Sequence, residues 1–375
     1  MAGNRKYRLG CILASLTAVL ACAAVRSLSP AINPETGPDM SSVSADAAGG
    51  AGSDSGHTVL LGGMPVGIYM ETDGVMVLST EQVRDTDGDY HDPSAGLIKT
   101  GDYITAVDHH QIEGKSDLLE AVDRWGNEEV TLTLRRDDAV LDVQMKPAEY
   151  APGKYRLGIW VRDNVQGLGT VTFLTENNRF GALGHGIHDI DTNLLMSIDS
   201  GRVYRTSIRD ITRGHSGSPG TMEGVIVYNN YNILGSIDKN TEAGIYGSLE
   251  PDSAFSGEII PVDTARKEEI HTGDATVRCY VDNSLKEYQI RVTDIDMSGA
   301  EINKGFVIEV TDPELLEITG GIIQGMSGSP ILQDGKLIGA VTHVFVQDST
   351  KGYGIFIENM LEEAETPALS NFVSN

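Results

Sequence analysis

The chain contains little cysteine. Cys11 and Cys22 lie in an apolar N-terminal run, and Cys279 stands alone far downstream. The sequence has no Cys-x-x-Cys pair and no cysteine-rich zinc spacing, which excludes a disulfide framework and a cysteine-based zinc module. A lone cysteine is usually a small buried hydrophobic residue, and we expect this of Cys279.

Basic and aromatic residues are also scarce. The 375 residues include 28 Lys and Arg against 54 Asp and Glu, giving a net charge of −26. Such an acidic surface repels phosphate backbones, so we expect no nucleic-acid partner. Aromatic residues make up 6%, whereas glycine occurs 43 times. This composition favours short strands joined by tight turns.

Long hydrophobic runs are limited to the N-terminus. Residues 9–25 carry no charge and follow the basic residues Arg5, Lys6 and Arg8. The run is just long enough for a membrane-spanning helix, and its positive flank directs the rest of the chain outward. We predict an uncleaved membrane anchor over residues 1–26 and an exported protein. A cleaved signal peptide is the alternative, because residues 21–24 are small.

Residues 27–57 lack large apolar side chains and are rich in Ser, Ala, Gly, Asp and Pro. Such a segment cannot bury enough surface to order itself. We predict a flexible linker that tethers the folded domains.

Ordered patterning resumes after the linker, and residues 58–148 resemble a PDZ domain. The Gly-Asp-Tyr-Ile run at residues 101–104 matches a PDZ strand, and residues 115–125 have helical spacing. In PDZ domains a peptide joins the sheet as an extra strand beside a helix. By this resemblance Gly67, Ile68 and Leu118 line a peptide-binding groove. The alternative is a domain that only packs against its neighbour.

The remaining region, residues 149–375, is dense in short strands. Alternating segments recur at residues 155–161, 169–174, 276–280, 288–292, 306–310 and 337–346. Helical periodicity is scarce apart from residues 357–365. The pattern predicts a mainly β domain, either a barrel or a sandwich.

The strongest chemical motif is Gly-Met-Ser-Gly-Ser-Pro at residues 325–330. A serine between glycines exposes its hydroxyl and lets nearby backbone N–H groups converge, as acyl transfer requires. The motif resembles the Gly-Asp-Ser-Gly-Gly-Pro signature of chymotrypsin-like serine proteases. This resemblance makes Ser327 the nucleophile and assigns the oxyanion hole to the N–H groups of Gly325 and Ser327.

His185 follows Ala-Leu-Gly, which is similar to the Ala-Ala-His of the same proteases, and is the candidate base. A metal site using His185 and His188 is the alternative, but the flanking glycines argue against the helical spacing of zincins. We therefore expect neither a metal nor a cofactor. Asp312, fifteen residues before Ser327, is the candidate third member, since it gives the order His, Asp, Ser. An Asp before proline is also a common turn starter.

A second Gly-x-Ser-Gly-Ser-Pro sequence occupies residues 214–219, with its serine at Ser216. It lies only 31 residues after His185, which leaves little chain for a second barrel. We predict that Ser327, and not Ser216, is the nucleophile.

Several segments of residues 155–360 resemble the SpoIVB sporulation serine peptidases, among them FGALGHGIHD and GGIIQGMSGSPILQDGKLIGAVTHVF. The resemblance implies a chymotrypsin-like double β-barrel and the triad His185, Asp312 and Ser327. It also implies a location between the two forespore membranes. There the enzyme cleaves the regulator of an intramembrane metalloprotease, which allows pro-sigma-K activation, and cleaves its own N-terminal region. The alternative is a non-catalytic PDZ scaffold with an inactive barrel.

Overall fold

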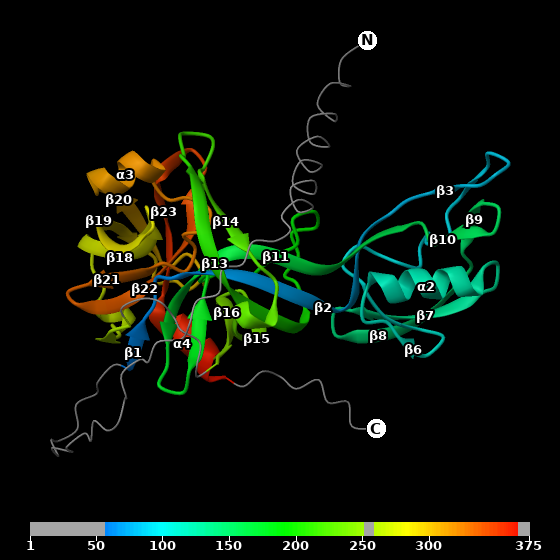
Figure 1. Ribbon diagram of the computed structural model, residues 1–375, viewed down its shortest axis with the longest axis horizontal. Coiled ribbons are helices and arrows are strands. Elements are labelled where there is room, and N and C mark those ends of the chain that lie inside the picture. The colour runs from blue at the N-terminus through cyan, green and yellow to red at the C-terminus, as the bar shows by residue number, and fades with distance from the viewer. Residues whose placement is uncertain (1–56, 251–258, 367–375) are drawn as a thin grey trace, which may run out of the picture. The chain divides into compact units, whose positions relative to one another are not determined.

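The computed structural model describes residues 57–250 and 259–366, so the predicted anchor and nearly all of the predicted linker lie outside the described residues. The described part is mainly β, as the strand pattern predicts, with short helices between the strands (Figure 1). Among the helices described, none is long and apolar enough to cross a membrane.

Six strands close into a first barrel. Strand β2 (Pro65–Thr80) pairs with both β11 (Ile159–Leu174) and β13 (Ile198–Thr212), and this double pairing closes the ring. The ring continues through β12 (Arg179–Ala182), β16 (Gly244–Leu249) and β15 (Ile233–Thr241). Three strands flank it: β1 (Thr58–Leu61), β14 (Thr221–Ile226) and β17 (Pro261–Asp263).

Six further strands form a second closed barrel. Its order is β18 (Gly273–Val281), β19 (Ser284–Ile295), β20 (Phe306–Val310), β23 (Asp348–Phe356), β22 (Lys336–Phe345) and β21 (Pro330–Gln333). Cys279 is 1% exposed in its core, and burial raises the pKa of its thiol to about 12. A thiol so protonated is inert, which confirms the expected structural role. The structure thus confirms a double β-barrel.

The two barrels share an apolar cluster that includes the C-terminal helix α4 (Ile357–Glu365). Met360 of α4 is fully buried beside Phe173 of the first barrel and Ile355 of the second. Helix α4 begins directly after β23, so its apolar face is placed against both barrels.

The third part of the fold, residues 74–161, surrounds helix α2 (Lys115–Trp125) and is called the α2 module below. Helix α2 lies beside the strands of this module (Figure 1). Its residues Leu118, Ala121 and Val122 are buried in an apolar cluster with residues of those strands. Those strands are β5 (Tyr103–Val107), β7 (Val130–Arg136) and β8 (Ala139–Met145), and shorter ones are β3 (Val83–Arg84), β4 (Tyr90–His91), β6 (His110–Gln111), β9 (Ala148–Ala151) and β10 (Lys154–Arg156).

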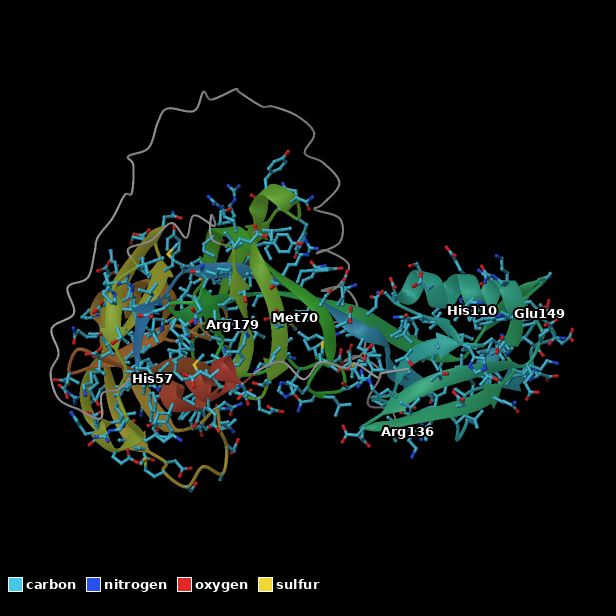
Figure 2. All side chains as sticks on the ribbon, turned by 90° about the horizontal axis from the view of Figure 1, so that it is seen from below. His57, Met70, His110, Arg136, Glu149 and Arg179 are labelled. Carbon is cyan, nitrogen blue, oxygen red and sulfur yellow. The ribbon has the colours of Figure 1, made fainter. Side chains whose placement is uncertain are left out.

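The Gly-Asp motif of the α2 module has a clear structural role. Asp102 is 1% exposed and accepts two hydrogen bonds from Arg136, both of 2.7 Å. Arg136 is labelled in Figure 2, where it lies at the end of a strand of this module. The Asp102 carboxylate also accepts the N–H of Lys99, so the buried charge is fully paired.

Candidate active site and peptide groove

Ser327 lies in the loop between α3 (Pro313–Thr319) and β21, within the second barrel. Its Oγ donates a 2.9 Å hydrogen bond to the carbonyl of Thr342. The glycines on either side, Gly325 and Gly328, have φ of +103° and +91°, which a side chain would strain. The motif therefore folds as the tight, serine-presenting loop that acyl transfer needs.

Two N–H groups of this loop have no partner in the described part of the chain, and they are those of Gly325 and Ser327. The neighbouring N–H groups of Met326, Gly328 and Ser329 are all bonded to backbone carbonyls. The loop thus leaves available the two donors that the protease resemblance assigns to an oxyanion hole. That role stays a prediction.

The first barrel holds the Ser327 loop in place through β11. The N–H of Thr170 donates to the carbonyl of Ser327, and its hydroxyl donates to the carbonyl of Gly325, both at 3.0 Å. The Thr172 hydroxyl donates to the carbonyl of Gly328 at 2.7 Å. Any side chain at residue 328 would collide with the carbonyl of Thr170, so only glycine permits this approach.

His185 reaches the same place from the first barrel. It follows β12 through Leu183 and Gly184, which both have positive φ, and Gly184 packs against Thr342. The ring centroids of His185 and His343 lie 4.8 Å apart, and His343 directly follows the Thr342 carbonyl that receives the Ser327 hydroxyl. The structure therefore brings both His185 and Ser327 to one short segment, Thr342 and His343.

No hydrogen bond joins His185 to Ser327 in the described structure. The Nδ1 of His185 faces the carbonyl of Gly186 at 2.8 Å. An imidazole nitrogen facing a carbonyl carries the proton, so Nε2 keeps the lone pair that a general base requires. Catalytic hydrogen bonds are often loose without substrate, and a rotation of the Ser327 hydroxyl off Thr342 frees it for Nε2.

Burial governs the charge of both histidines. It lowers the pKa of His185, with His188 acting in the same direction and Gly186 and Glu242 opposing it. Close packing and the neighbouring His185 lower the pKa of His343 to about 4. His185 is consequently neutral at pH 7 and able to accept a proton.

Among the described residues the structure shows no hydrogen bond or ion pair between Asp312 and His185, so it does not support the predicted triad role of Asp312. One Asp312 oxygen accepts the N–H groups of Glu314 and Leu315 at the start of α3, and the other accepts that of Gln289. Asp312 is a helix N-cap, which is the turn-starting role that its place before a proline also permitted.

Residues 213–220, which contain Ser216, support the Ser327 loop from outside. The Ser216 hydroxyl donates to the carbonyl of Gln347 at 2.8 Å. The backbone N–H of Gln324 donates to the carbonyl of Gly220 at 2.9 Å. The carbonyl of Gln324 accepts the N–H of Met222 at 2.8 Å. Gln324 directly precedes Gly325, so the segment that holds the second serine motif braces the start of the Ser327 loop.

Two of the residues predicted to line a peptide groove, Gly67 and Ile68, lie outside the α2 module. Gly67 and Ile68 belong to the first barrel. Gly67 pairs with Leu168 of β11, and Ile68 pairs with Val203 of β13. The Ile68 side chain is 1% exposed. Likewise β1, which we placed in the PDZ domain, pairs with β11 and β17 of the barrel. The reason is that β2 and β11 are both sixteen residues long and run from the barrel into the α2 module.

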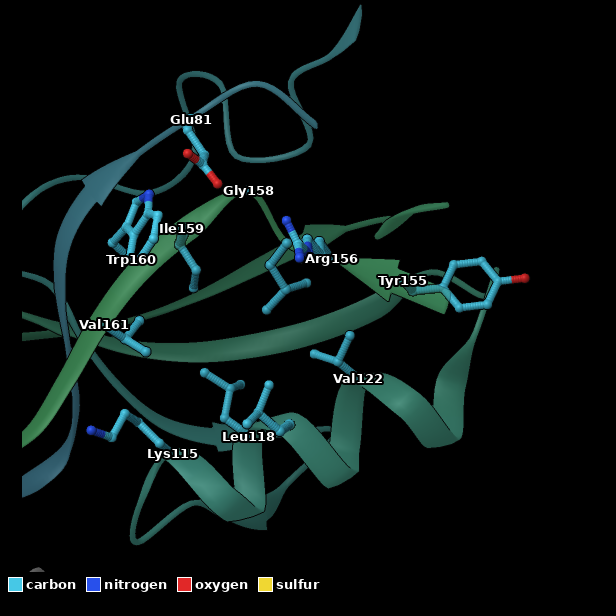
Figure 3. Close-up of a pocket in the computed structure, with 12 residues that line it drawn as sticks. Glu81, Lys115, Leu118, Val122, Tyr155, Arg156, Gly158, Ile159, Trp160 and Val161 are labelled. Carbon is cyan, nitrogen blue, oxygen red and sulfur yellow. The ribbon is translucent and has the colours of Figure 1, made fainter. Parts of the chain in front are cut away.

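A groove of about 290 Å³ does lie along α2, and Leu118 lines it as predicted. Its opposite wall is residues 157–161, a segment that the sequence pattern predicted only as part of a strand. Leu118 and Val122 point from α2 toward Ile159 and Val161 across the groove (Figure 3).

One end of the groove presents main-chain donors. The N–H groups of Leu157 and Gly158 have no partner among the described residues, although both residues are buried. Gly158 has a φ of +68° and its carbonyl accepts from Glu81 and Ser94, which fixes the turn. The groove thus combines an apolar floor with free N–H groups, as a site for an extended peptide requires.

The family comparison decides the class of the chain. The model of the SpoIVB peptidase S55 family matches residues 153–361, which hold the whole second barrel and the first barrel except β2, and which contain Ser327 and His185. The chain belongs to the SpoIVB peptidase S55 family. It is therefore a serine peptidase, which confirms the predicted enzyme class.

Several solved structures are similar to this chain at low identity. The PDZ domain of an SdrC-like protein from Listeria monocytogenes is 22% identical, covers 24% of this chain and 87% of its own, and has a TM-score of 0.19. The active form of the Rv3671c protease from M. tuberculosis is 15% identical, with coverages of 54% and 75% and a TM-score of 0.28. The HtrA-type protease AlgW with a decapeptide is 12% identical, with coverages of 54% and 53% and a TM-score of 0.31. A search of curated proteins found no match.

The described residues contain no group of three or more His, Cys, Asp or Glu side chains able to hold a metal ion. His188, the metal candidate beside His185, instead faces the carbonyl of Gly186 and the carboxylate of Glu242. The motifs predicted no role for Glu242 or His343, although both lie in segments that resemble the family.

Proposed function

We propose that this peptidase is an exported, membrane-tethered serine endopeptidase with Ser327 as nucleophile and His185 as base. The observation that carries the proposal is the meeting of the two loops at Thr342 and His343, beside two free backbone N–H groups. These are the parts that hydrolysis of a peptide bond needs.

The proposed reaction follows from this geometry. The Ser327 Oγ attacks the scissile carbonyl carbon while Nε2 of His185 takes its proton. The N–H groups of Gly325 and Ser327 stabilise the oxyanion that forms. His185 then gives its proton to the departing amine, and water hydrolyses the acyl-enzyme with His185 again acting as base.

Family membership supports a finer proposal about the substrate. We propose that the enzyme acts in sporulation, in the space between the two forespore membranes. There it cleaves a membrane-bound regulator of an intramembrane metalloprotease, which permits pro-sigma-K activation, and it cleaves its own N-terminal region. The α2 groove captures a segment of the target as an added strand and raises its concentration near Ser327.

A trans-cleavage assay tests this proposal. Active enzyme is mixed with the full-length Ser327→Ala chain as substrate, and the products are identified by intact mass. We expect a first cut between residues 27 and 57, where the composition favours an extended chain. A substrate chain that stays intact, or is first cut within residues 58–250, contradicts the proposal.

A further inference from the structure

The Gly-Asp-Tyr-Ile run of the α2 module, residues 101–104, contacts the segment of chain that follows His185. That segment, residues 187–196, folds back on itself and is called the His185 hairpin below. The N–H of Met196 donates to the carbonyl of Ile187 at 3.1 Å and closes the base of the hairpin. A single glycine separates the hairpin from His185, so the position of the hairpin bears directly on the base.

The α2 module holds the His185 hairpin near its turn and at its far end. Near the turn, Leu194 packs on Gly101, where a Cβ atom would lie only 2.6 Å from the Leu194 Cδ1 atom. At the far end, the buried hydroxyl of Tyr103 accepts the N–H of Ser197 at 3.0 Å. The guanidinium of Arg135 stacks 4.4 Å from the Tyr103 ring centroid and donates to the Ser197 hydroxyl at 3.1 Å. The module therefore fixes two separate points of the hairpin.

The strand that borders the groove adds a third attachment. Arg162 of β11 pairs with Asp189 and Asp191 of the hairpin, at 2.6 and 2.7 Å. The next residue, Asp163, accepts the N–H of Lys115 at 2.9 Å, at the start of α2. Two neighbouring residues of β11 thus join the hairpin to the helix of the α2 module.

Gly186 transmits the position of the hairpin to His185. A Cβ atom at residue 186 would lie 2.3 Å from the Cδ1 atom of Leu195 in the hairpin and 2.7 Å from the carbonyl oxygen of Thr241 in β15. The backbone of Gly186 is therefore closely packed between the hairpin and the barrel. Its carbonyl faces Nδ1 of His185 at 2.8 Å and sets the tautomer of the imidazole. A displaced hairpin would move this carbonyl and the imidazole with it.

We propose that Tyr103 and Arg162 are positioning residues of this peptidase, which hold the His185 hairpin and through it the imidazole of His185. The α2 module then serves the chemical step on every substrate, including a short peptide that does not reach the groove. A misplacement of about 1 Å can lower a rate by about 10²-fold, so the loss of such contacts is measurable. The proposal rests on the proposed function, because it takes His185 as the base.

The test measures kcat and KM on a short peptide, and the rate at which a fluorophosphonate labels Ser327, in variants of the full chain. Tyr103→Phe removes the acceptor hydroxyl, and Leu194→Ala removes a side chain that is 44% exposed, so both variants should fold. We expect each to lower kcat and the labelling rate roughly threefold to tenfold, and the double variant to lower both further. KM should change little. Tyr228→Phe is the matched control, because its hydroxyl bonds Gln166 outside the hairpin, and it should keep the wild-type rates.

Substitutions of Arg162 give a second test at a temperature where every variant is folded. Arg162→Gln removes the charge that pairs with both hairpin carboxylates, and kcat should fall roughly tenfold to a hundredfold. Arg162→Lys keeps a positive charge but lacks the forked guanidinium, so it should recover part of this loss. A merely structural role would lower stability without this graded change in kcat.

Wild-type kcat and labelling rates in the folded double variant Tyr103→Phe/Leu194→Ala would overturn the proposal. A loss confined to KM would also overturn it, because the hairpin would then act in substrate binding. Equal losses in Tyr228→Phe would do the same. Failure of the proposed function is distinguishable, since the wild-type enzyme would then neither hydrolyse the peptide nor be labelled on Ser327.

Discussion

At the scale of single residues, the Asp312 carboxylate holds the start of a helix against a neighbouring strand. Its two oxygens accept three backbone N–H groups, from Gln289, Glu314 and Leu315. Capping by Asp stabilises a helix start by about 1 kcal/mol, and the bond to Gln289 also ties α3 to β19.

We predict that Asp312→Ala lowers the free energy of unfolding by about 1–2 kcal/mol, since the cap and a sheet contact are lost. The folded enzyme should keep most of its kcat. Thermal unfolding and peptide hydrolysis below the midpoint measure the two effects separately. A folded variant with full stability but no activity would return Asp312 to the catalytic role.

Spacing in the sequence could not separate a helix-capping Asp312 from a catalytic one. Asp312 has the expected distance from Ser327 and the expected chain order, and both are equally compatible with a helix cap before proline. The contacts of Glu242 depend on the turn between β15 and β16 meeting the His185 loop. The two segments are distant in the sequence and meet only in the folded chain, so no local sequence pattern indicates the contact. Ser327 and His185 could be found because their glycine-rich loops carry local signals.

At the scale of elements, the groove along α2 is formed by a helix and the start of a barrel strand. The helix was predictable from its periodicity, and Leu118 from its place on the apolar face. The opposing wall was not, because β2 and β11 change partners partway along their length. Alternation along a strand shows which side chains are buried but not which strand lies beside it.

We predict that Leu118→Asp slows cleavage of a protein substrate much more than hydrolysis of a short peptide. The added charge disrupts the apolar floor of the groove but lies outside the Ser327 and His185 loops. Rates on the Ser327→Ala chain and on a peptide give the comparison. Ser116→Asp is the matched control, because Ser116 is exposed on the same helix and lies outside the lining of the groove. Equal losses on both substrates would make the α2 module a structural support only.

At the scale of the whole molecule, β11 links the groove to the His185 loop. Directly after the groove wall, Arg162 forms ion pairs of 2.6 Å with Asp189 and 2.7 Å with Asp191. Asp189 is 1% exposed, and one of its oxygens organises the His185 loop by accepting the N–H groups of Asp191 and Thr192. The His185 loop is therefore anchored to β11, the strand that borders the groove along α2.

We predict that Arg162→Ala destabilises the fold by roughly 3 kcal/mol, because it leaves Asp189 buried and unpaired. Thermal or denaturant unfolding measures the change. Arg209→Ala, which removes an exposed arginine from β13, should cost less than about 0.5 kcal/mol. Similar values for the two variants would show that the pair with Asp189 adds little.

The central claim is that Ser327, activated by His185, is the nucleophile of this peptidase. A fluorophosphonate probe reacts with an activated serine and can be located by peptide mass. We predict label on Ser327 in the wild type and in Ser216→Ala. We predict none in Ser327→Ala and labelling at least about 10³-fold slower in His185→Ala. Label on Ser216, or undiminished labelling of Ser327→Ala, would contradict the account.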